Sequence, residues 1–289
     1  MYKIAFLGVE NSHANAFLEY IYDKKGVSDI EVVGVYSNEP EAAAKLSEKY
    51  GIENAASPDA FVGRVDGIVI TARDGKYHYP YAKPYFESGI PMFIDKPITT
   101  NLADAELMLG ALRTYKNKYC GCSSLKFSKE LLTLKNEIAE LGEGEFYGGF
   151  LRAPVSLVND YGNFWFYSQH LVQIACEAFG YRPVSAFAVQ NGKVVTVSLT
   201  YNKYTATLEY VDGNYKYFAY GSTKDGMKGG ELTLDGVFDS EFREYYSILK
   251  GGEQPISELE FIAPVAILCA IERSLESGRA ETVEYPEGV

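Results

Sequence analysis

The feature that most constrains the fold is a regular alternation of strand and helix patterns over the first 118 residues. Short apolar runs cover residues 3–7, 31–36, 66–71 and 92–94, and a stretch with helical spacing of apolar residues follows each run. Because strands alternate with helices across short loops, we expect right-handed crossovers and a parallel sheet covered on both faces. In such sheets ligands bind beyond the carboxyl ends of the strands, so functional residues should directly follow the strands.

The second half of the sequence has a different pattern. Helical spacing recurs over residues 131–141 and 165–179, and later over 238–249 and 257–277. Between these pairs of helices, Asn191-Gly192 and Asp212-Gly213 are hairpin signals, which predict that 185–190 pairs with 194–201 and 204–211 with 215–220. We therefore predict an α/β protein with two domains, a parallel-sheet domain over 1–118 and an α+β domain with an open, mainly antiparallel sheet over 119–289.

Composition limits the kinds of binding partner and the cellular compartment that we expect for this protein. The chain carries 27 basic and 39 acidic side chains, a net charge of −12, which disfavours binding to nucleic acid. No apolar run approaches the roughly 18–20 residues that span a bilayer, and the opening residues do not resemble a signal peptide. The four cysteines form no Cys-x-x-Cys pair, so we expect reduced thiols in a cytoplasmic protein without a membrane partner: Cys120, Cys122, Cys176 and Cys269.

Several catalytic signatures are missing from the sequence. There is no His-x-x-x-His or Cys-x-x-Cys spacing and no acidic loop with ligand spacing, so we expect no metal site. There is also no Gly-x-Ser-x-Gly elbow and no Walker loop. The candidate chemistry therefore rests on residues at the ends of the predicted strands.

The first of these segments lies between the first strand and the first helix, where a dinucleotide-binding loop would lie. Such a loop needs glycines for a tight turn and for close approach to the pyrophosphate. Gly8 is present, but Glu10 and His13 occupy the second and third glycine positions. Asn11 and Ser12 can still cap the helix and leave its N–H groups facing an anion. The loop alone is a weak signal for a dinucleotide.

The residues after the second strand are Ser37 and Asn38. An enzyme that uses NAD usually places an acid here against the ribose hydroxyls, whereas these side chains suit a ribose phosphate about equally well. The choice between NAD and NADP therefore stays open. An alternative interpretation is that Asn38 only caps the next helix, which has Pro40 in its first turn.

The fourth strand is followed directly by Asp95, Lys96 and Pro97. This position places the ammonium group of Lys96 at the ligand-binding edge, where it can hydrogen-bond a substrate oxygen and a ribose, while Pro97 restricts the turn. A surface lysine without a role is the alternative, and its position at a strand end argues against that alternative.

The chain has three histidines, which are His13, His78 and His170. The first two follow predicted strands, and His170 lies in a helix at the edge of its apolar stripe. A single helical histidine is more often a core residue than a catalyst. Nevertheless, all three can face one cleft, and histidine is the side chain best suited to proton transfer near neutral pH. Tyr161, Trp165 and Tyr167 lie near His170 and can stack on a sugar-like ring, although packing in the core is the simpler interpretation of each.

Taken together, these segments resemble the Gfo/Idh/MocA family of NAD(P)-dependent oxidoreductases, the group of glucose-fructose oxidoreductase and inositol dehydrogenase. Thr71 and His78 resemble the family's Thr-Pro-Asn-x-x-His loop, here two residues longer, and Asp95-Lys96-Pro97 resembles its Glu-Lys-Pro motif. Residues 121–127 resemble its entry into the second domain, and Gln169-His170-Leu171 resembles the helix that carries its catalytic histidine.

The resemblance implies a Rossmann domain that binds NAD or NADP and a second domain that binds a sugar, a polyol or a related small molecule. It implies that Lys96 and His170 are catalytic. The implied cofactor-binding residues are Gly8, Val9, Asn11, Ser12, His13, Ser37, Asn38, Thr71, Ala72, His78, Asp95, Lys96 and Pro97. The substrate candidates are Lys126, Tyr161, Trp165, Phe166 and Tyr167. We also expect a homo-oligomer, a dimer or a tetramer, formed through the open sheet.

The sequence departs from the family pattern at three positions. Glu10 replaces a glycine, Ser37 replaces the usual ribose acid, and Phe166 stands where dehydrogenases of the family often carry an aspartate. Two rival functions therefore remain beside an NAD(P)-dependent dehydrogenase. One is a non-catalytic or regulatory module that binds the cofactor, and the other is a non-redox relative that uses NAD transiently in glycoside cleavage or elimination.

Overall fold

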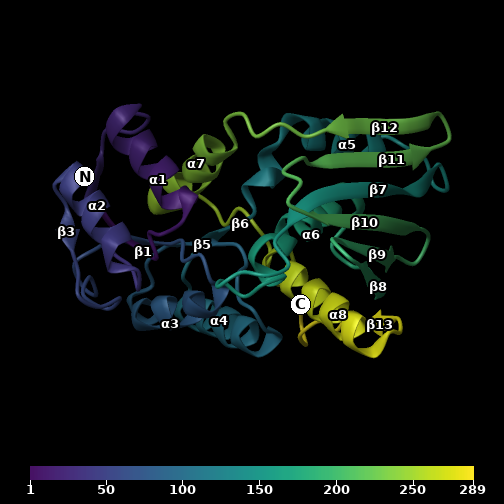
Figure 1. Ribbon diagram of the computed structural model, residues 1–289. Coiled ribbons are helices and arrows are strands. Elements are labelled where there is room, and N and C mark those ends of the chain that lie inside the picture. The colour runs from purple at the N-terminus through teal and green to yellow at the C-terminus, as the bar shows by residue number, and fades with distance from the viewer. The chain divides into compact units, whose positions relative to one another are not determined.

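The computed structural model describes all 289 residues, and the chain forms two compact units (Figure 1). The first contains Met1–Cys122 and Phe238–Ser257, and the second contains Ser123–Val237 and Glu258–Val289. The first unit thus includes a segment from the C-terminal part of the chain. The expectation of independent domains over 1–118 and 119–289 stays a prediction.

The sheet of the first unit has six strands in the order β3-β2-β1-β4-β5-β6, and every neighbouring pair is parallel. This confirms the predicted parallel sheet. The order is that of dinucleotide-binding folds, in which a ligand binds where the strand order reverses, here between β1 and β4. The strands are β1 (Tyr2–Leu7), β2 (Ile30–Tyr36), β3 (Glu53–Asn54), β4 (Gly67–Ile70), β5 (Met92–Asp95) and β6 (Tyr119–Cys122).

Strands β4, β5 and β6 are buried along their whole length, as expected for parallel strands with helices on both faces. The helical segments of this unit largely follow the predicted spacing of apolar residues. They are α1 (Ser12–Leu18), the π-helical turn η1 (Glu19–Asp23), α2 (Pro40–Tyr50), the short 3₁₀ segments η2 (Gly75–Tyr77) and η3 (Lys83–Ser88), α3 (His78–Ala82), α4 (Leu102–Tyr115) and α7 (Val237–Leu249).

Helix α7 belongs to the first unit because its aromatic face packs into that unit's core. The Phe242 ring lies 5.2 Å from the Phe17 ring of α1, and the Tyr245 ring lies 6.3 Å from the Phe93 ring of β5. All four side chains are fully buried. Burial of a large aromatic side chain contributes roughly 1.5–3 kcal/mol, so this helix is a substantial part of the first unit's core.

The start of α2 differs in one detail from the prediction. Capping of this helix was the alternative interpretation of Asn38, but Glu39 is the N-cap residue and its side chain makes no capping hydrogen bond. The Ser37 hydroxyl instead accepts a hydrogen bond of 3.0 Å from the Glu39 backbone N–H. The interpretation of Asn38 as the cap was therefore wrong, because the helix begins at Pro40 and the cap position falls on Glu39. Pro40 occupies the first turn, as predicted.

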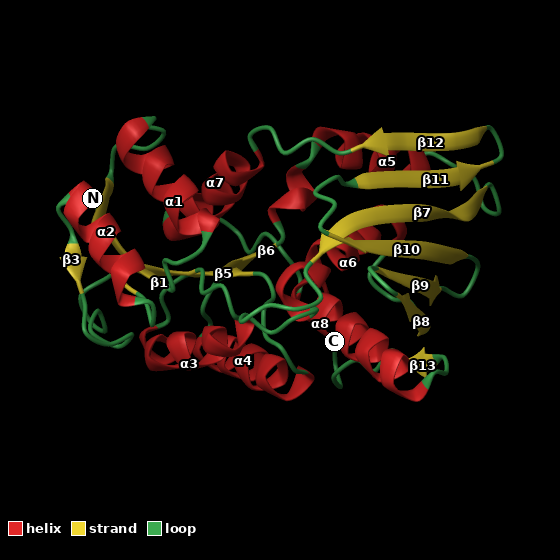
Figure 2. Cartoon of the chain, in the orientation of Figure 1, coloured by secondary structure: helices red, strands yellow, loops and turns green.

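The second unit contains a mixed, mainly antiparallel sheet in the order β12-β11-β7-β10-β9-β8-β13 (Figure 2). Its strands are β7 (Phe146–Val155), β8 (Ser185–Asn191), β9 (Val194–Thr200), β10 (Thr205–Asp212), β11 (Phe218–Thr223), β12 (Gly226–Glu231) and β13 (Glu281–Thr282). Its helical segments are η4 (Ser124–Phe127), α5 (Lys129–Ala139), α6 (Trp165–Phe179) and α8 (Glu258–Ser277). None of the helices is both long and apolar enough to cross a membrane.

One of the two predicted hairpins is present. Strands β8 and β9 pair antiparallel across Asn191-Gly192, as expected. The pairing of β10 with β11 was wrong, because β7 lies between them and pairs parallel with β10 and antiparallel with β11. The signal at Asp212-Gly213 marks a turn, but the strand after it, β11, lies on the other side of β7 from β10.

Strand β7 was not predicted because it contains residues that usually interrupt strands. Gly148 and Gly149 are adjacent, and Pro154 lacks the N–H group that a central strand uses. The structure explains both glycines. A Cβ atom on Gly148 would lie 2.1 Å from the Thr205 carbonyl oxygen, and one on Gly149 would lie 2.3 Å from the Tyr220 carbonyl oxygen. The neighbouring backbones therefore come closer than any side chain would allow.

Candidate active site

Polar residues gather at the carboxyl edge of the first unit's sheet, although that region is largely buried. The ends of β1, β2, β4 and β5 meet at this edge, because all these strands are parallel. Buried polar groups are costly unless they are paired, so this concentration marks the edge as the candidate site. The buried polar residues here are Glu10, Asn11, His13, Ser37, Thr71, Asp74, His78, Asp95, Lys96 and Thr99.

The loop after β1 turns tightly at Gly8 and is held from both sides. Gly8 has φ +76°, and its N–H donates to the Tyr36 carbonyl oxygen at 2.8 Å. The Thr71 hydroxyl donates to the Gly8 carbonyl oxygen at 2.9 Å. A Cβ atom on Gly8 would lie 2.4 Å from the Ala72 backbone. Gly8 therefore gives the loop both its turn and its closeness to β4, while Val9 and Ala72 are buried beside it.

Asn11 connects the start of α1 to the end of β5. Its Oδ1 atom accepts a hydrogen bond of 2.7 Å from the Ser12 N–H, so Asn11 is the N-cap of α1. Its Nδ2 atom donates to Asp95 Oδ2 at 2.8 Å. Ser12 itself is exposed at the first position of the helix.

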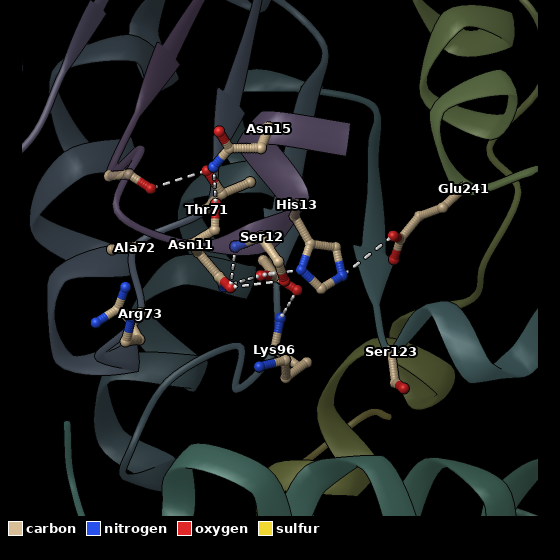
Figure 3. A network of polar contacts seen from close by, with 12 residues as sticks. Asn11, Ser12, His13, Asn15, Thr71, Ala72, Arg73, Lys96, Ser123 and Glu241 are labelled. Atoms are coloured by element: carbon tan, nitrogen blue, oxygen red, sulfur yellow. Dashed lines mark hydrogen bonds and ion pairs between the residues drawn. The ribbon is translucent and has the colours of Figure 1, made fainter. Parts of the chain in front are cut away.

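The His13 side chain lies between two buried carboxylates (Figure 3). Its Nδ1 atom is 3.1 Å from Asp95 Oδ2, and its Nε2 atom is 3.4 Å from Glu241 Oε2 of α7. Burial lowers the pKa of His13 to about 4, and the charge of Asp95 opposes this. Burial raises the pKa of Asp95 to about 6, opposed by the charges of His13 and Lys96. The imidazole is thus neutral at pH 7, and both of its nitrogen atoms contact buried groups of the first unit.

His78 is also fully buried, at the start of α3. Its Nε2 atom lies 2.9 Å from the Ala72 carbonyl oxygen, and burial lowers its pKa. The imidazole therefore ties the loop after β4 to α3. Both rings contact groups inside the first unit. Cofactor binding by His13 and His78 stays a prediction.

Lys96 is the buried cation of the site. Its side chain follows β5 and is almost fully buried, and its backbone N–H donates to Asp95 Oδ1 at 2.6 Å. Burial lowers the pKa of Lys96, while the negative charges of Asp95 and Glu241 oppose the shift. Pro97 follows through a cis peptide bond and is itself buried. A lysine whose pKa is lowered by burial can exchange a proton more readily than an exposed one.

Glu10 does not project away from the site as a free surface carboxylate. Its Oε2 atom accepts a 2.5 Å hydrogen bond from the Ser37 hydroxyl, and its Oε1 atom accepts one of 2.8 Å from the Arg73 backbone N–H. The Arg73 guanidinium donates to the Glu10 carbonyl oxygen. Asn38, by contrast, is exposed. The residue at the second glycine position therefore reaches sideways to the end of β2.

In the second unit, His170 lies on α6 and is largely buried. Its Nδ1 atom is 2.7 Å from the Ser123 hydroxyl oxygen, which also accepts a weaker hydrogen bond of 3.3 Å from the Leu125 N–H. Ser123 was missed by the sequence analysis. It directly follows β6, so the rule that functional residues follow strands pointed to it.

The predicted substrate residues fall into two groups. Aromatic rings form a run beside His170. The distance between ring centres is 5.4 Å from Tyr161 to Phe166 and 4.7 Å from Phe166 to Tyr167. The Tyr167 ring centre lies 5.6 Å from that of His170. Trp165 is separate from this run, because it is buried and its indole N–H donates to Glu272 at 3.0 Å. Lys126 is nearly buried, with its ammonium group 5.0 Å from the centre of the Phe127 ring.

Comparison with known proteins finds a family model that is similar to most of the first unit. Residues 2–121 match the GFO_IDH_MocA family, described as an oxidoreductase family with an NAD-binding Rossmann fold. A relative from Amycolatopsis mediterranei (strain S699), provisionally named a UDP-kanosamine synthase oxidoreductase subunit, is 25% identical over 116 residues. That match covers 40% of this chain and 32% of the relative, so the chain spans about a third of its length in the alignment.

Solved structures match almost the whole chain in fold. A myo-inositol dehydrogenase from Corynebacterium glutamicum ATCC 13032 matches with a TM-score of 0.81 and 18% identity, over 99% of this chain and 100% of that one. A scyllo-inositol dehydrogenase from Lactobacillus casei matches with a TM-score of 0.82 and 14% identity, over 98% of each chain. GenD2 from gentamicin A biosynthesis, solved with NAD, matches with a TM-score of 0.84 and 12% identity, over 98% of this chain and 97% of that one.

These matches agree with the site geometry. At such identities the solved structures establish the fold alone, and they extend it over both units. A glycine with positive φ after β1, the strand order and the polar carboxyl edge all fit a dinucleotide-binding domain. The expected fold is therefore confirmed, and the expected resemblance to an NAD-binding oxidoreductase family is confirmed over residues 2–121. Over residues 2–121 the chain is similar to the Gfo/Idh/MocA family of oxidoreductases, whose model is described as an NAD-binding Rossmann fold.

Proposed function

We propose that this protein transfers a hydride between a nicotinamide cofactor and a hydroxyl-bearing carbon of a sugar, a polyol or a related small molecule. The observation that carries the proposal is Lys96, a buried ammonium group at the carboxyl end of β5 in a sheet with dinucleotide-binding strand order. The cofactor supplies the hydride chemistry, and the protein supplies binding, orientation and proton transfer.

In this proposal Lys96 polarises the substrate oxygen. An ammonium group removed from water interacts strongly with a developing negative charge on oxygen, because little solvent screens it. In the absence of substrate, Asp95 and Glu241 compensate the charge of Lys96. Their negative charges reduce the free-energy cost of burying the ammonium group. Ser37 and Lys96 are the residues that we expect to contact the two riboses of the cofactor.

His170 is the proposed base for the hydroxyl proton. Ser123 lies at hydrogen-bond distance from Nδ1. When the Ser123 oxygen accepts the Nδ1 proton, the basic lone pair of the neutral imidazole lies on Nε2, which is the nitrogen that we expect to take the proton of the substrate. General base catalysis of this kind contributes roughly 10²–10⁴-fold to turnover.

The aromatic run of Tyr161, Phe166 and Tyr167 supports a ring-shaped, hydroxyl-rich substrate. Aromatic faces stack on the apolar faces of sugar-like rings, and the related structures include inositol dehydrogenases. Phe166 contributes a ring where many dehydrogenases of the family have an aspartate. Ser123 is therefore the partner that we propose for His170 in its place.

We also infer a homo-oligomer, a dimer or a tetramer, formed through the open sheet of the second unit. Phe187 and Val189 of β8 point to the same face and are 40% and 41% exposed. Large apolar side chains repeated on one sheet face favour a subunit interface. Light scattering of the purified protein would test this, and a monomer would contradict it.

Turnover with a panel of inositols, aldoses and polyols tests the proposed activity. We expect NAD⁺ or NADP⁺ to be reduced with at least one compound, and Lys96→Ala to lower the rate of reduction by about 10²–10⁴-fold. Lys45→Ala is the matched control, because Lys45 is an exposed lysine of α2 outside the site. Cofactor binding without turnover on any compound would favour a non-catalytic module, and substrate breakdown without reduced cofactor would favour the non-redox chemistry.

A further inference from the structure

The end of β2 lacks the acid that commonly contacts the adenosine ribose in NAD-binding domains, yet a carboxylate is present there. It comes from Glu10 in the loop after β1, whose Oε2 atom lies 2.5 Å from the Ser37 hydroxyl. Ser37 is the residue at the position of the usual acid. The Glu10 carboxylate thus lies at the position where NAD-binding domains usually have the acid that contacts the ribose.

The contacts of Glu10 hold its carboxylate at this place. Oε1 accepts from the Arg73 N–H at 2.8 Å, and Glu10 is only 7% exposed. The carboxylate is therefore held by one donor at the end of β2 and by another just after β4. Two hydrogen bonds from different strand ends leave little freedom for the side chain to turn toward a pyrophosphate.

From this arrangement we propose that Glu10 is the residue that selects NAD over NADP, in place of an acid at the end of β2. A carboxylate accepts hydrogen bonds from the two ribose hydroxyls, whereas a 2′-phosphate would place like charges against each other in a partly buried site. The inference rests on the NAD-binding domain and specifies which form of the cofactor that domain takes.

Arg73 is the residue that argues for the opposite preference, because a guanidinium group is a good ligand for a 2′-phosphate. Its guanidinium donates to the Glu10 carbonyl oxygen, and its Nη1 atom lies 3.9 Å from Glu39 Oε1. The guanidinium is therefore engaged with two acceptors, the Glu10 carbonyl oxygen and the Glu39 carboxylate. A phosphate that reached Arg73 would have to share the space with Glu10.

The test is direct binding of NADH and NADPH, measured by the fluorescence of the reduced nicotinamide without any substrate. We expect the wild-type protein to bind NADH about tenfold or more tightly than NADPH. Glu10→Gln keeps the shape of the side chain and removes its charge, so we expect the ratio to fall toward one, mainly through tighter binding of NADPH.

Three further variants separate the proposed role from general damage to the site. Glu39→Gln removes a nearby acid whose carboxylate lies beside Arg73 and whose contact with Ser37 is made by the backbone N–H alone, and we expect the wild-type ratio to persist. Glu10→Gly alone should lose the preference, and adding Ser37→Asp, which restores an acid at the end of β2, should recover it.

Equal affinities in the wild-type protein, a preference for NADPH, or an unchanged ratio in Glu10→Gln would each overturn the assignment. If neither reduced cofactor binds, the nicotinamide-dependent function itself fails, which is a different result from equal binding. Thermal unfolding of each variant confirms that the measured ratios belong to folded protein.

Discussion

The His13 Nδ1 atom lies 3.1 Å from Asp95 Oδ2, inside a core where both side chains are almost completely buried. Asp95 also accepts a hydrogen bond from Asn11 and another from the Lys96 backbone N–H. A single carboxylate therefore joins the loop after β1 to the turn that carries Lys96. Its partner His13 is joined in turn to α7 through Glu241.

This pair predicts two opposite dependences of stability on pH. The pKa of His13 is lowered from 6.5 to about 4, so unfolding takes up a proton between these values and His13 makes stability rise with pH. The pKa of Asp95 is raised from 3.8 to about 6, so unfolding releases a proton and Asp95 makes stability fall as pH rises. In the wild-type protein the two contributions oppose each other between about pH 4 and 6.

We expect the single variants to separate these contributions. Relative to wild type, the free energy of unfolding of Asp95→Asn should rise with pH across this window, and that of His13→Gln should fall. Each difference should approach about 1 kcal/mol per pH unit. Urea unfolding at several pH values measures it, and parallel profiles for the three proteins would show that the pair does not titrate as described.

Gly8 offers a test of the tight loop. Gly8→Ala puts a Cβ atom 2.4 Å from the Ala72 backbone at a residue with φ +76°, so both steric overlap and backbone strain oppose it. Gly51→Ala is the control, because Gly51 has φ +67° and open space around it. We expect Gly8→Ala to cost about 1–3 kcal/mol more than Gly51→Ala in denaturant unfolding. Equal losses would mean that the loop has room that the structure does not show.

The first unit illustrates what can be predicted from sequence. Its strands are continuous apolar runs and its helices have regular apolar spacing, so local pattern and final structure agree. The packing of α7 against Phe17 and Phe93 could not be predicted, because nothing local in residues 238–249 indicates which sheet they cover. Strand β7 was missed for another reason, since Gly148 and Gly149 are required by neighbouring backbones that are distant in sequence.

The candidate site was predictable where it depends on position along a strand. Asp95 ends a strand and Lys96 and Thr71 follow strands, and the structure places all three at one edge as the parallel order requires. The direction of a side chain was not predictable. The sequence identifies Glu10 only as a residue at a glycine position of the loop, and its contact with Ser37 depends on the relative placement of two loops.

His170 and Ser123 should act together on the pH dependence of turnover. We expect His170→Asn to reduce turnover by about 10²–10⁴-fold and to remove the limb of the pH profile near neutrality. Ser123→Ala removes the contact at Nδ1, so that limb should shift while cofactor affinity stays within a few-fold. Ser123→Thr keeps the hydroxyl and should restore the wild-type profile. A profile that none of these changes alters would make the histidine structural.

Lys96 is the residue with the largest expected effect on the reaction. Lys96→Ala should lower turnover by about 10²–10⁴-fold and leave the affinity for reduced cofactor within a few-fold. Fluorescence titration and steady-state rates on the same preparation separate the two effects. Full turnover in this variant would remove the lysine from the mechanism.

The central claim is the transfer of hydride from a carbinol carbon to the nicotinamide ring, and isotopic label follows that transfer directly. Inositols and sugars deuterated at their carbinol carbons are incubated with NAD⁺ and the protein, and the reduced cofactor is analysed by mass spectrometry. We predict deuterium in the NADH formed by the wild-type protein and by Lys45→Ala, and none above background with Lys96→Ala. Protein that binds NADH but yields no labelled cofactor from any of these compounds would contradict the claim.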